Sequence, residues 1–277
     1  MIFERIKSEG LAHNSYFIGS GNSAAVIDPR RDIQVYLDLA QTRGMRVKGI
    51  FETHRNEDYV IGSIELAAAT QAAVYHGPRP DWQYGSVLSE GQTFKFGGIN
   101  LTAILTPGHT DESVSLILTD LASGKNPVMV FTGDALFVGD TGRVDLYGPA
   151  EITRLSANLF ESVFKRILPL GDGVILCPAH GAGSVCGVNI ADRDESSLGT
   201  ERLQNPALKN VNKPDFIRYK NLEKPERPPY FLKMEKDNLA GPPLLHGLPS
   251  PPPLPAAEFK NEIDDGAIVV DASWPAA

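Results

Sequence analysis

Four short polar stretches hold the residue types that could do chemistry in this chain. The first contains His54 and Asp58, and the others contain His109, Asp134 and His180. Imidazole and carboxylate groups bind metal ions and transfer protons in enzymes. Each stretch comes just after a strand-like run, and loops that rigid elements hold in place often carry functional residues. We therefore expect the four stretches to meet at one edge of the fold and to form one site.

The elements around the first stretch alternate between strand and helix. Strand-like runs at 15–18 and 24–27 are joined by a hairpin-like turn, and a helix follows that ends at Gly44. The polar stretch then lies between a strand at 47–51 and apolar residues at roughly helical spacing from 60 to about 71. This alternation predicts an α/β class.

The following part of the chain is richer in strands. Short β runs are expected at 93–96, 99–105, 114–118 and 128–131. A helix from 150 to 167 and a buried strand at 174–177 come next. The pattern indicates two β-rich halves with helices outside them.

The first stretch, Thr53–Tyr59, resembles the His-x-His-x-Asp-His signature of the metallo-β-lactamase superfamily. His54 and Asp58 stand where the signature has His and Asp, whereas Asn56 and Tyr59 stand where it has His. Three later stretches are similar to the other ligand motifs of the family, in the same order and approximate spacing: 106–110, 132–137 and 178–181. The resemblance implies a four-layer αββα sandwich.

The replacement of two signature histidines indicates which kind of metal centre the chain can form. In dizinc members of the superfamily, the positions of Asn56 and Tyr59 each supply an imidazole to a metal, and an amide or a phenol is a poor substitute on zinc. A dizinc hydrolase is therefore not expected. Persulfide dioxygenases, a subset that the sequence resembles, bind one iron through positions that are all kept here, namely His54, His109 and Asp134. Two His and one carboxylate are the ligand set of non-haem Fe(II) oxygenases.

A second similarity to these dioxygenases lies in Gly133–Phe137 followed by Gly142–Leu146. The resemblance implies an enzyme with one Fe(II) per chain, which oxidises a thiol persulfide with O₂ to sulfite and the thiol. Its partners would be O₂ and a low-molecular-weight persulfide of glutathione, coenzyme A or a similar thiol. Fe(II) would hold the two reactants close together.

Further residues are candidates for roles beside the metal. Asp58 and His180 would orient ligands or a bound water, and Tyr59 would donate a hydrogen bond into the pocket. Arg143 would either pair with Asp145 or contact an anionic substrate.

The chain has two cysteines, which are expected to be free thiols. Cys177, in an apolar strand, is interpreted as an inert core thiol. Cys186 follows a Gly-rich loop at the expected mouth of the site, where it would either relay sulfur or be a plain loop residue.

Beyond about residue 198 the chain is punctuated by prolines and its helices must be short. We predict that this extension completes a domain over 1–240, followed by a Pro-rich linker at 241–256. Residues 257–271 are similar to the opening of a rhodanese (sulfurtransferase) domain, with a helical turn and then a strand at 267–271, so 257–277 is interpreted as a rhodanese-like segment. So short a segment cannot usually fold alone. We expect an incomplete rhodanese-like segment, as in the N-terminal part of a dioxygenase–rhodanese fusion.

Composition narrows the classes of partner. The net charge of -8 argues against broad binding of nucleic acid or anionic membranes. No apolar run approaches the ~20 residues of a membrane-spanning helix. Charges at the N-terminus do not fit a signal peptide, so a cytoplasmic location is expected. The family resemblance leaves a homodimer open.

Two other functions are also compatible with the sequence. One is a hydrolase of the glyoxalase II or thioesterase type, in which a single Zn(II) activates water. The other is a catalytically degenerate scaffold coupled to a sulfurtransferase, which would bind no stoichiometric metal.

Overall fold

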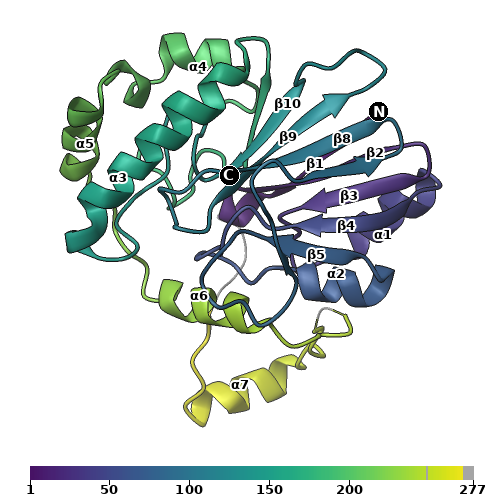
Figure 1. The fold of residues 1–277 in the computed structure, drawn as a ribbon. Helices are drawn as coiled ribbons and strands as arrows, with labels where there is room; N and C mark the ends of the chain where they lie inside the picture. Colours follow the sequence, from purple (N-terminus) through teal and green to yellow (C-terminus); the bar gives the residue numbers. More distant parts are fainter. Residues whose placement is uncertain (248, 271–277) are drawn as a thin grey trace. The chain divides into compact units, whose positions relative to one another are not determined.

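The structure, a computed structural model, describes residues 1–247 and 249–270. It divides into two compact units, Met1–Leu244 and the segment from Leu245 onward. The first unit contains two β-sheets with helices on their outer faces (Figure 1).

The first sheet has six strands in the spatial order β1 (Ile2–Ser8), β2 (His13–Ser20), β3 (Ser23–Ile27), β4 (Arg46–Phe51), β5 (Ala73–His76) and β6 (Ser86–Val87). The pairs from β1 to β3 are antiparallel, and those from β3 to β6 are parallel. The second sheet has five strands in the order β11 (Ile175–Pro178), β10 (Met129–Gly133), β9 (Val114–Asp120), β8 (Ile99–Leu105) and β7 (Thr93–Phe96). Only its pair β10–β11 is parallel. Both sheets are therefore mixed.

Alternating side chains of β2 pack into two different hydrophobic cores. Tyr16 and Ile18 point into the core between the two sheets, where they join Phe131 of β10. Phe17 points the other way and packs with Tyr36 of α1. Because successive residues of a strand face opposite sides, one strand buries apolar surface in both layers.

Helices cover the outer face of each sheet. The first sheet is covered by α1 (Gln34–Thr42) and α2 (Ser63–Thr70). The second is covered by α3 (Ile152–Phe160), its π-helical continuation η3 (Glu161–Ile167) and α5 (Lys213–Leu222). The ring of Phe216 in α5 lies 5.8 Å from that of Phe160. The layer order is the αββα arrangement that the family resemblance implied.

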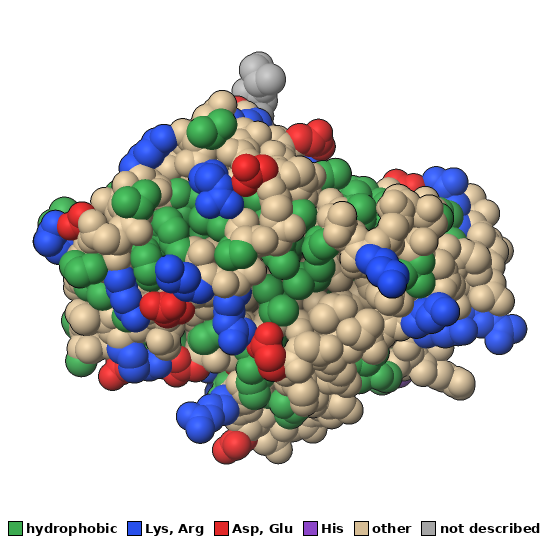
Figure 2. All heavy atoms as spheres, turned by 45° about the horizontal axis from the view of Figure 1, so that its top comes forward, with side chains coloured by type: hydrophobic (Ala, Val, Ile, Leu, Met, Phe, Trp, Pro, Cys, Tyr) green, Lys and Arg blue, Asp and Glu red, His purple; other side chains and the backbone are tan. Residues whose placement is uncertain are grey.

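The remaining helices are short: η1 (Glu9–Leu11), η2 (Pro149–Glu151), η4 (Leu168–Leu170), α4 (Leu198–Gln204), η5 (Ala207–Lys209), α6 (Phe231–Ala240) and α7 (Ala256–Asp264). The prediction of short helices beyond residue 198 is therefore confirmed. No helix in the described part of the chain is long and apolar enough to cross a membrane. On the face shown in Figure 2, Lys and Arg side chains are interspersed with Asp and Glu side chains over the left and middle of the view, and mainly Lys and Arg side chains lie at its right edge.

Three elements differ from the sequence prediction. The helix expected from residue 60 begins at Ser63, because the amide of Asn238 holds the preceding backbone at Tyr59 and Ile61 in an extended loop. The helix expected over 150–167 is α-helical only to Phe160. Strand β1 was missed because its charged residues hide the apolar alternation, and such residues are common on the edge strand of a sheet.

Beyond Leu244 the described residues support only part of the prediction. The helical turn expected after residue 256 is present as α7. The prediction of a strand at 267–271 is wrong for residues 267–270, which form no strand in the described part of the chain. Residue 271 and the rest of the rhodanese-like segment lie outside the described residues, and 249–270 form no rhodanese domain.

Candidate metal centre

The four polar stretches meet at one edge of the two sheets. They follow the carboxyl ends of four strands, and each contributes one histidine or aspartate of the centre: His54 after β4, His109 after β8, Asp134 after β10 and His180 after β11. All four side chains are buried. The expected convergence is therefore observed.

Two histidines and one aspartate face a common point. The Nε2 atoms of His54 and His109 each lie 3.7 Å from Oδ2 of Asp134. The two imidazole rings lie 5.0 Å apart and nearly perpendicular, at 82°. Nε2 of His54 is buried and has no hydrogen-bond partner among the residues that the structure describes. Since donors on one ion at about 2.1 Å lie within about 4.2 Å of each other, both distances fit a shared metal ion.

The outer nitrogen of each histidine is held by a neighbour. Nδ1 of His109 donates to the backbone oxygen of Arg143 at 2.9 Å. Thr53 donates its hydroxyl proton to Asp28 at 2.7 Å, so its oxygen accepts from Nδ1 of His54 at 3.0 Å. The proton of each neutral ring is therefore on Nδ1, and the lone pair of Nε2 points into the site. This is the tautomer that a metal ligand needs.

Backbone geometry places Asp134. Gly133, just before it, has a φ of +53°, and a Cβ there would lie 2.6 Å from Oγ1 of Thr53. Only glycine meets both conditions without strain. The Gly-Asp pair thus turns the carboxylate of Asp134 toward the two histidines.

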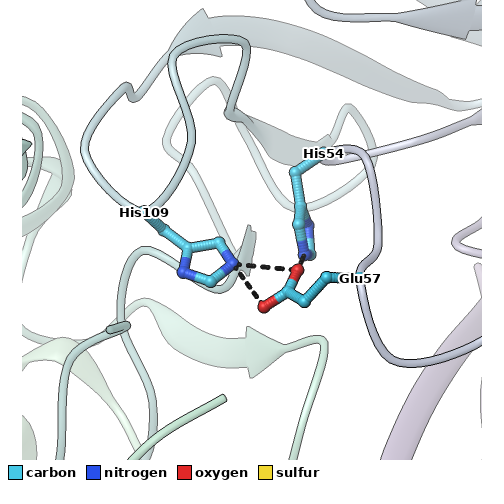
Figure 3. Close-up of side chains that lie close together, drawn as sticks. All are labelled: His54, Glu57 and His109. Atoms are coloured by element: carbon cyan, nitrogen blue, oxygen red, sulfur yellow. Dashed lines mark hydrogen bonds and ion pairs between the residues drawn. The ribbon is translucent and has the colours of Figure 1, made fainter. Parts of the chain in front are cut away.

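Glu57 is a buried residue of the site that was not predicted from the sequence. Figure 3 shows its carboxylate pointing toward the rings of His54 and His109. Its Oε1 lies 3.2 Å from Nε2 of His109, and its Oε2 lies 3.8 Å from Nε2 of His54. Glu57 occupies an unspecified position of the signature, so only its acidic side chain next to Asp58 could have drawn attention to it.

His180 links two carboxylates. Its Nδ1 lies 2.8 Å from Oδ1 of Asp134, and its Nε2 lies 3.0 Å from Oδ2 of Asp58. Burial alone would lower the pKa of His180, but Asp134 and Asp58 raise it well above its usual range. Burial opposes ionisation of Asp58, yet His180 lowers the pKa of that carboxyl. His180 is therefore an imidazolium that fixes the orientation of Asp134.

Comparison with known proteins agrees with this site. The sequence matches the metallo-beta-lactamase superfamily over residues 9–180, which includes all four stretches. The chain belongs to this superfamily. A solved metallo-beta-lactamase structure from Staphylococcus aureus has a TM-score of 0.81 and 31% identity, over 88% of this chain and 74% of that one. With its buried His, Asp and Glu cluster, the chain is a metal-dependent enzyme of the superfamily.

Two curated relatives show which branches it is similar to. The mitochondrial persulfide dioxygenase ETHE1 of Bos taurus is 29% identical over 77% of this chain and 79% of its own length. A hydroxyacylglutathione hydrolase of Neisseria gonorrhoeae is 30% identical over 60% of this chain and 61% of its own length. The match to the dioxygenase covers more of both chains.

The two residues that replace histidines of the superfamily signature do not join the ligand cluster. Asn56 donates its amide to the backbone oxygen of His54 at 3.3 Å. Tyr59 packs on His13, with ring centroids 4.2 Å apart, and its buried hydroxyl has no partner among the described residues. Burial raises the pKa of Tyr59 well above its usual range and lowers that of His13 to about 3. His13 lies outside every motif, so no sequence signal pointed to it.

Arg143 is fully engaged within the protein. Its guanidinium forms a bidentate pair with Asp145, at 2.7 and 2.8 Å. Its other N–H groups donate to the backbone oxygens of Val185, Pro225 and Glu226. Of the two expected roles, the structure shows the pairing with Asp145, and no N–H group is left for a substrate.

Cys186 lies inside the site. Its thiol is fully buried and donates to Oε1 of Glu57 at 3.4 Å, although the loop before it is largely exposed. Burial raises the pKa of Cys186 well above its usual range, and nearby acidic groups add to this effect. Cys177 is also buried, and its pKa is raised to about 12. Both side chains are free thiols.

Proposed function

We propose that the chain is an Fe(II)-dependent persulfide dioxygenase, which converts a thiol persulfide, O₂ and water to the thiol, sulfite and two protons. The observation that carries the proposal is that Nε2 of His54 and Nε2 of His109 each lie 3.7 Å from Oδ2 of Asp134, with Asn56 and Tyr59 outside this group. Two His and a carboxylate with open positions are typical of non-haem Fe(II) oxygenases. Similarity to the bovine dioxygenase supports the same conclusion.

Bound Fe(II) would activate O₂ and bring it beside the terminal sulfur of the substrate. The protein holds the ligands for this chemistry in fixed orientations. Hydrogen bonds set the tautomers of His54 and His109, and the His180 imidazolium fixes Asp134. Such supporting contacts typically change metal affinity or activity by about 10–100-fold when they are removed.

Several groups that are not ligands surround the metal centre. The hydroxyl of Tyr59 has no hydrogen-bond partner in the described part of the chain, and we propose that it donates to the substrate or to O₂. Asp58 faces His180 and keeps it protonated. The ligand side chains are almost completely buried, which excludes water and strengthens the electrostatic interactions among them. A small persulfide, of glutathione or coenzyme A, is the substrate class that we propose.

A mononuclear hydrolase of the glyoxalase II type is the second candidate, because the chain is similar to a hydroxyacylglutathione hydrolase. It would use Zn(II) and would cleave a thioester. A rhodanese-like partner domain, which we propose from the sequence of residues 257–277, would handle the same sulfane sulfur.

The test uses protein loaded anaerobically with Fe(II). O₂ uptake and sulfite are measured with glutathione persulfide and with coenzyme A persulfide, and S-lactoylglutathione hydrolysis is followed in parallel with the Zn(II) form. We expect stoichiometric O₂ uptake and sulfite formation by the wild type. The Asp134→Ala variant should lose this activity, and the control variant His246→Ala should retain it. Thioester hydrolysis without O₂ uptake would overturn the proposal in favour of the hydrolase.

A further inference from the structure

We propose that Glu57 is a fourth protein ligand of the metal centre, so that two histidines and two carboxylates hold the ion. The inference rests on the proposed function in that it assumes one ion at His54, His109 and Asp134, but it does not depend on the reaction that the ion supports.

The position of Glu57 is that of a ligand. Its carboxylate is fully buried and faces both imidazoles, as Figure 3 shows. The separations from Nε2 of His109 and Nε2 of His54 are 3.2 and 3.8 Å. The 3.7 Å between each histidine and Asp134 falls in the same range. Geometry alone therefore does not distinguish Glu57 from Asp134 as a donor.

The tautomer of His109 strengthens the argument. Its Nδ1 donates to a backbone oxygen of Arg143, which can only accept, so the lone pair of the neutral ring is on Nε2. That lone pair points at an anionic oxygen of Glu57. Two electron pairs so placed repel unless a proton or a metal ion lies between them. A metal ion shared by Nε2 and the carboxylate would take the place of that proton.

Burial gives a second reason for a shared ion. Glu57 and Asp134 are both fully buried, and no Lys or Arg of the described chain forms an ion pair with either. Isolated buried carboxylates are costly unless they are paired or coordinate a metal. Asp134 is paired with His180, whose Nδ1 lies 2.8 Å from Oδ1 of the carboxylate. Among the described residues, the polar partners of the Glu57 carboxylate are the Cys186 thiol, at 3.4 Å, and the two site histidines. A divalent cation balances its charge.

The fourth donor also accounts for the altered signature. Asn56 lacks the imidazole that the superfamily signature has at this position, and its amide is turned away to the backbone of His54. Glu57, the next residue, supplies an anionic oxygen to the same cluster. On a six-coordinate ion, four protein donors leave two positions, which is the number that a persulfide sulfur and O₂ require. Cys186 holds the carboxylate by donating its thiol proton to Oε1.

The test is an anaerobic titration of the metal-free protein with Co(II), followed by visible absorption, which depends on the number and type of donors. It compares the wild type with Glu57→Gln and Glu57→Ala. Glu52→Gln is the matched control, because Glu52 is also fully buried and lies in the same segment, but its oxygens accept from Tyr84 at 2.9 Å instead of facing the site. Circular dichroism and denaturation show whether each variant folds.

We expect Glu57→Ala to weaken Co(II) binding by at least about tenfold and to change the absorption bands, with a smaller change for Glu57→Gln and none for Glu52→Gln. Weaker binding with an unchanged spectrum would make Glu57 a positioning residue and overturn the proposal, as would wild-type affinity in Glu57→Ala. If Glu57→Ala does not fold, Glu57→Gln decides by the same spectral criterion. If the wild type binds no ion, both proposals fail, whereas binding without dioxygenase activity overturns only the proposed function.

Discussion

The side-chain amide of Asn238 donates a hydrogen bond of 2.7 Å to the backbone oxygen of Asn56, 182 residues earlier in the chain. It also donates to the backbone oxygen of Tyr59 and accepts from the amide of Ile61. Helix α6 of the C-terminal extension thus holds the loop that carries His54, Glu57 and Asp58. The extension is part of the metal centre's support.

Replacing Asn238 by Ala should therefore loosen the site. The change removes three buried hydrogen bonds and leaves backbone groups without partners, so we expect a loss of about 2–4 kcal/mol in the free energy of unfolding. Metal affinity should fall as well. Urea denaturation and metal titration measure the two effects. The control is Asn221→Ala. Asn221 donates one exposed hydrogen bond to the backbone oxygen of Ile217, so its loss should lower the free energy of unfolding by less than about 0.5 kcal/mol. Equal stabilities of the two variants would contradict the role of Asn238.

Arg143 should act through packing and hydrogen bonds. Lysine cannot reproduce its bidentate pair with Asp145 or its contacts to Pro225 and Glu226, so Arg143→Lys should lower the free energy of unfolding by about 2–4 kcal/mol. The backbone around Glu226 should also become cleavable by a glutamate-specific protease.

Arg166→Lys is the matched control for Arg143→Lys, because Arg166 forms an exposed pair with Glu90. It should change stability by less than about 1 kcal/mol. If Arg143→Lys kept its stability but lost affinity for persulfide, Arg143 would instead be a substrate-binding residue.

Removing the metal should destabilise the fold. An ion that binds only the folded state stabilises it by about 4 kcal/mol at a thousandfold excess over its Kd. For a domain of this size, each kcal/mol shifts Tm by about 2–4 °C. We expect a chelator to lower Tm by about 10 °C in the wild type. His54→Ala should show no such shift, and an unchanged wild-type Tm would mean that the folded protein does not bind the ion.

The two thiols should resist modification in the folded protein. Both are buried and their pKa values are raised, and the thiolate is the reactive form. We expect a thiol reagent to label neither Cys177 nor Cys186 until a denaturant is added, after which it should label both. Rapid labelling of Cys186 in the folded state would show that it is accessible and ionised.

The relay role of Cys186 is tested separately. Mass spectrometry after exposure to substrate should find a persulfide on Cys186 if it carries sulfur. Full O₂ uptake by Cys186→Ser would rule the role out and leave the thiol as the hydrogen-bond partner of Glu57.

Site residues that directly follow a strand with a clear apolar pattern could be predicted from the sequence. His54, His109 and Asp134 each follow a strand whose apolar pattern is clear, and the order of their motifs indicated that they would converge. Their proximity in the structure follows from that order, because the strand ends meet at one edge of the sheets.

Residues whose place depends on loop conformation or distant contacts were not predictable. Glu57 and Asn56 are adjacent, and only the folded loop decides which of them faces the ligands. Asn238 lies in a short polar helix without any motif, and its bonds to the loop depend on how the extension packs. His13 lies in β2, and its contact with Tyr59 depends on the pairing of distant elements.

We propose that a single iron is bound at His54, His109 and Asp134. Metal analysis of protein purified without oxygen, beside the His54→Ala variant, tests this directly. We expect about one iron per chain in the wild type and a large loss in the variant. Zinc in place of iron would indicate the hydrolase, and no bound metal even after Fe(II) is supplied would leave the degenerate scaffold as the remaining interpretation.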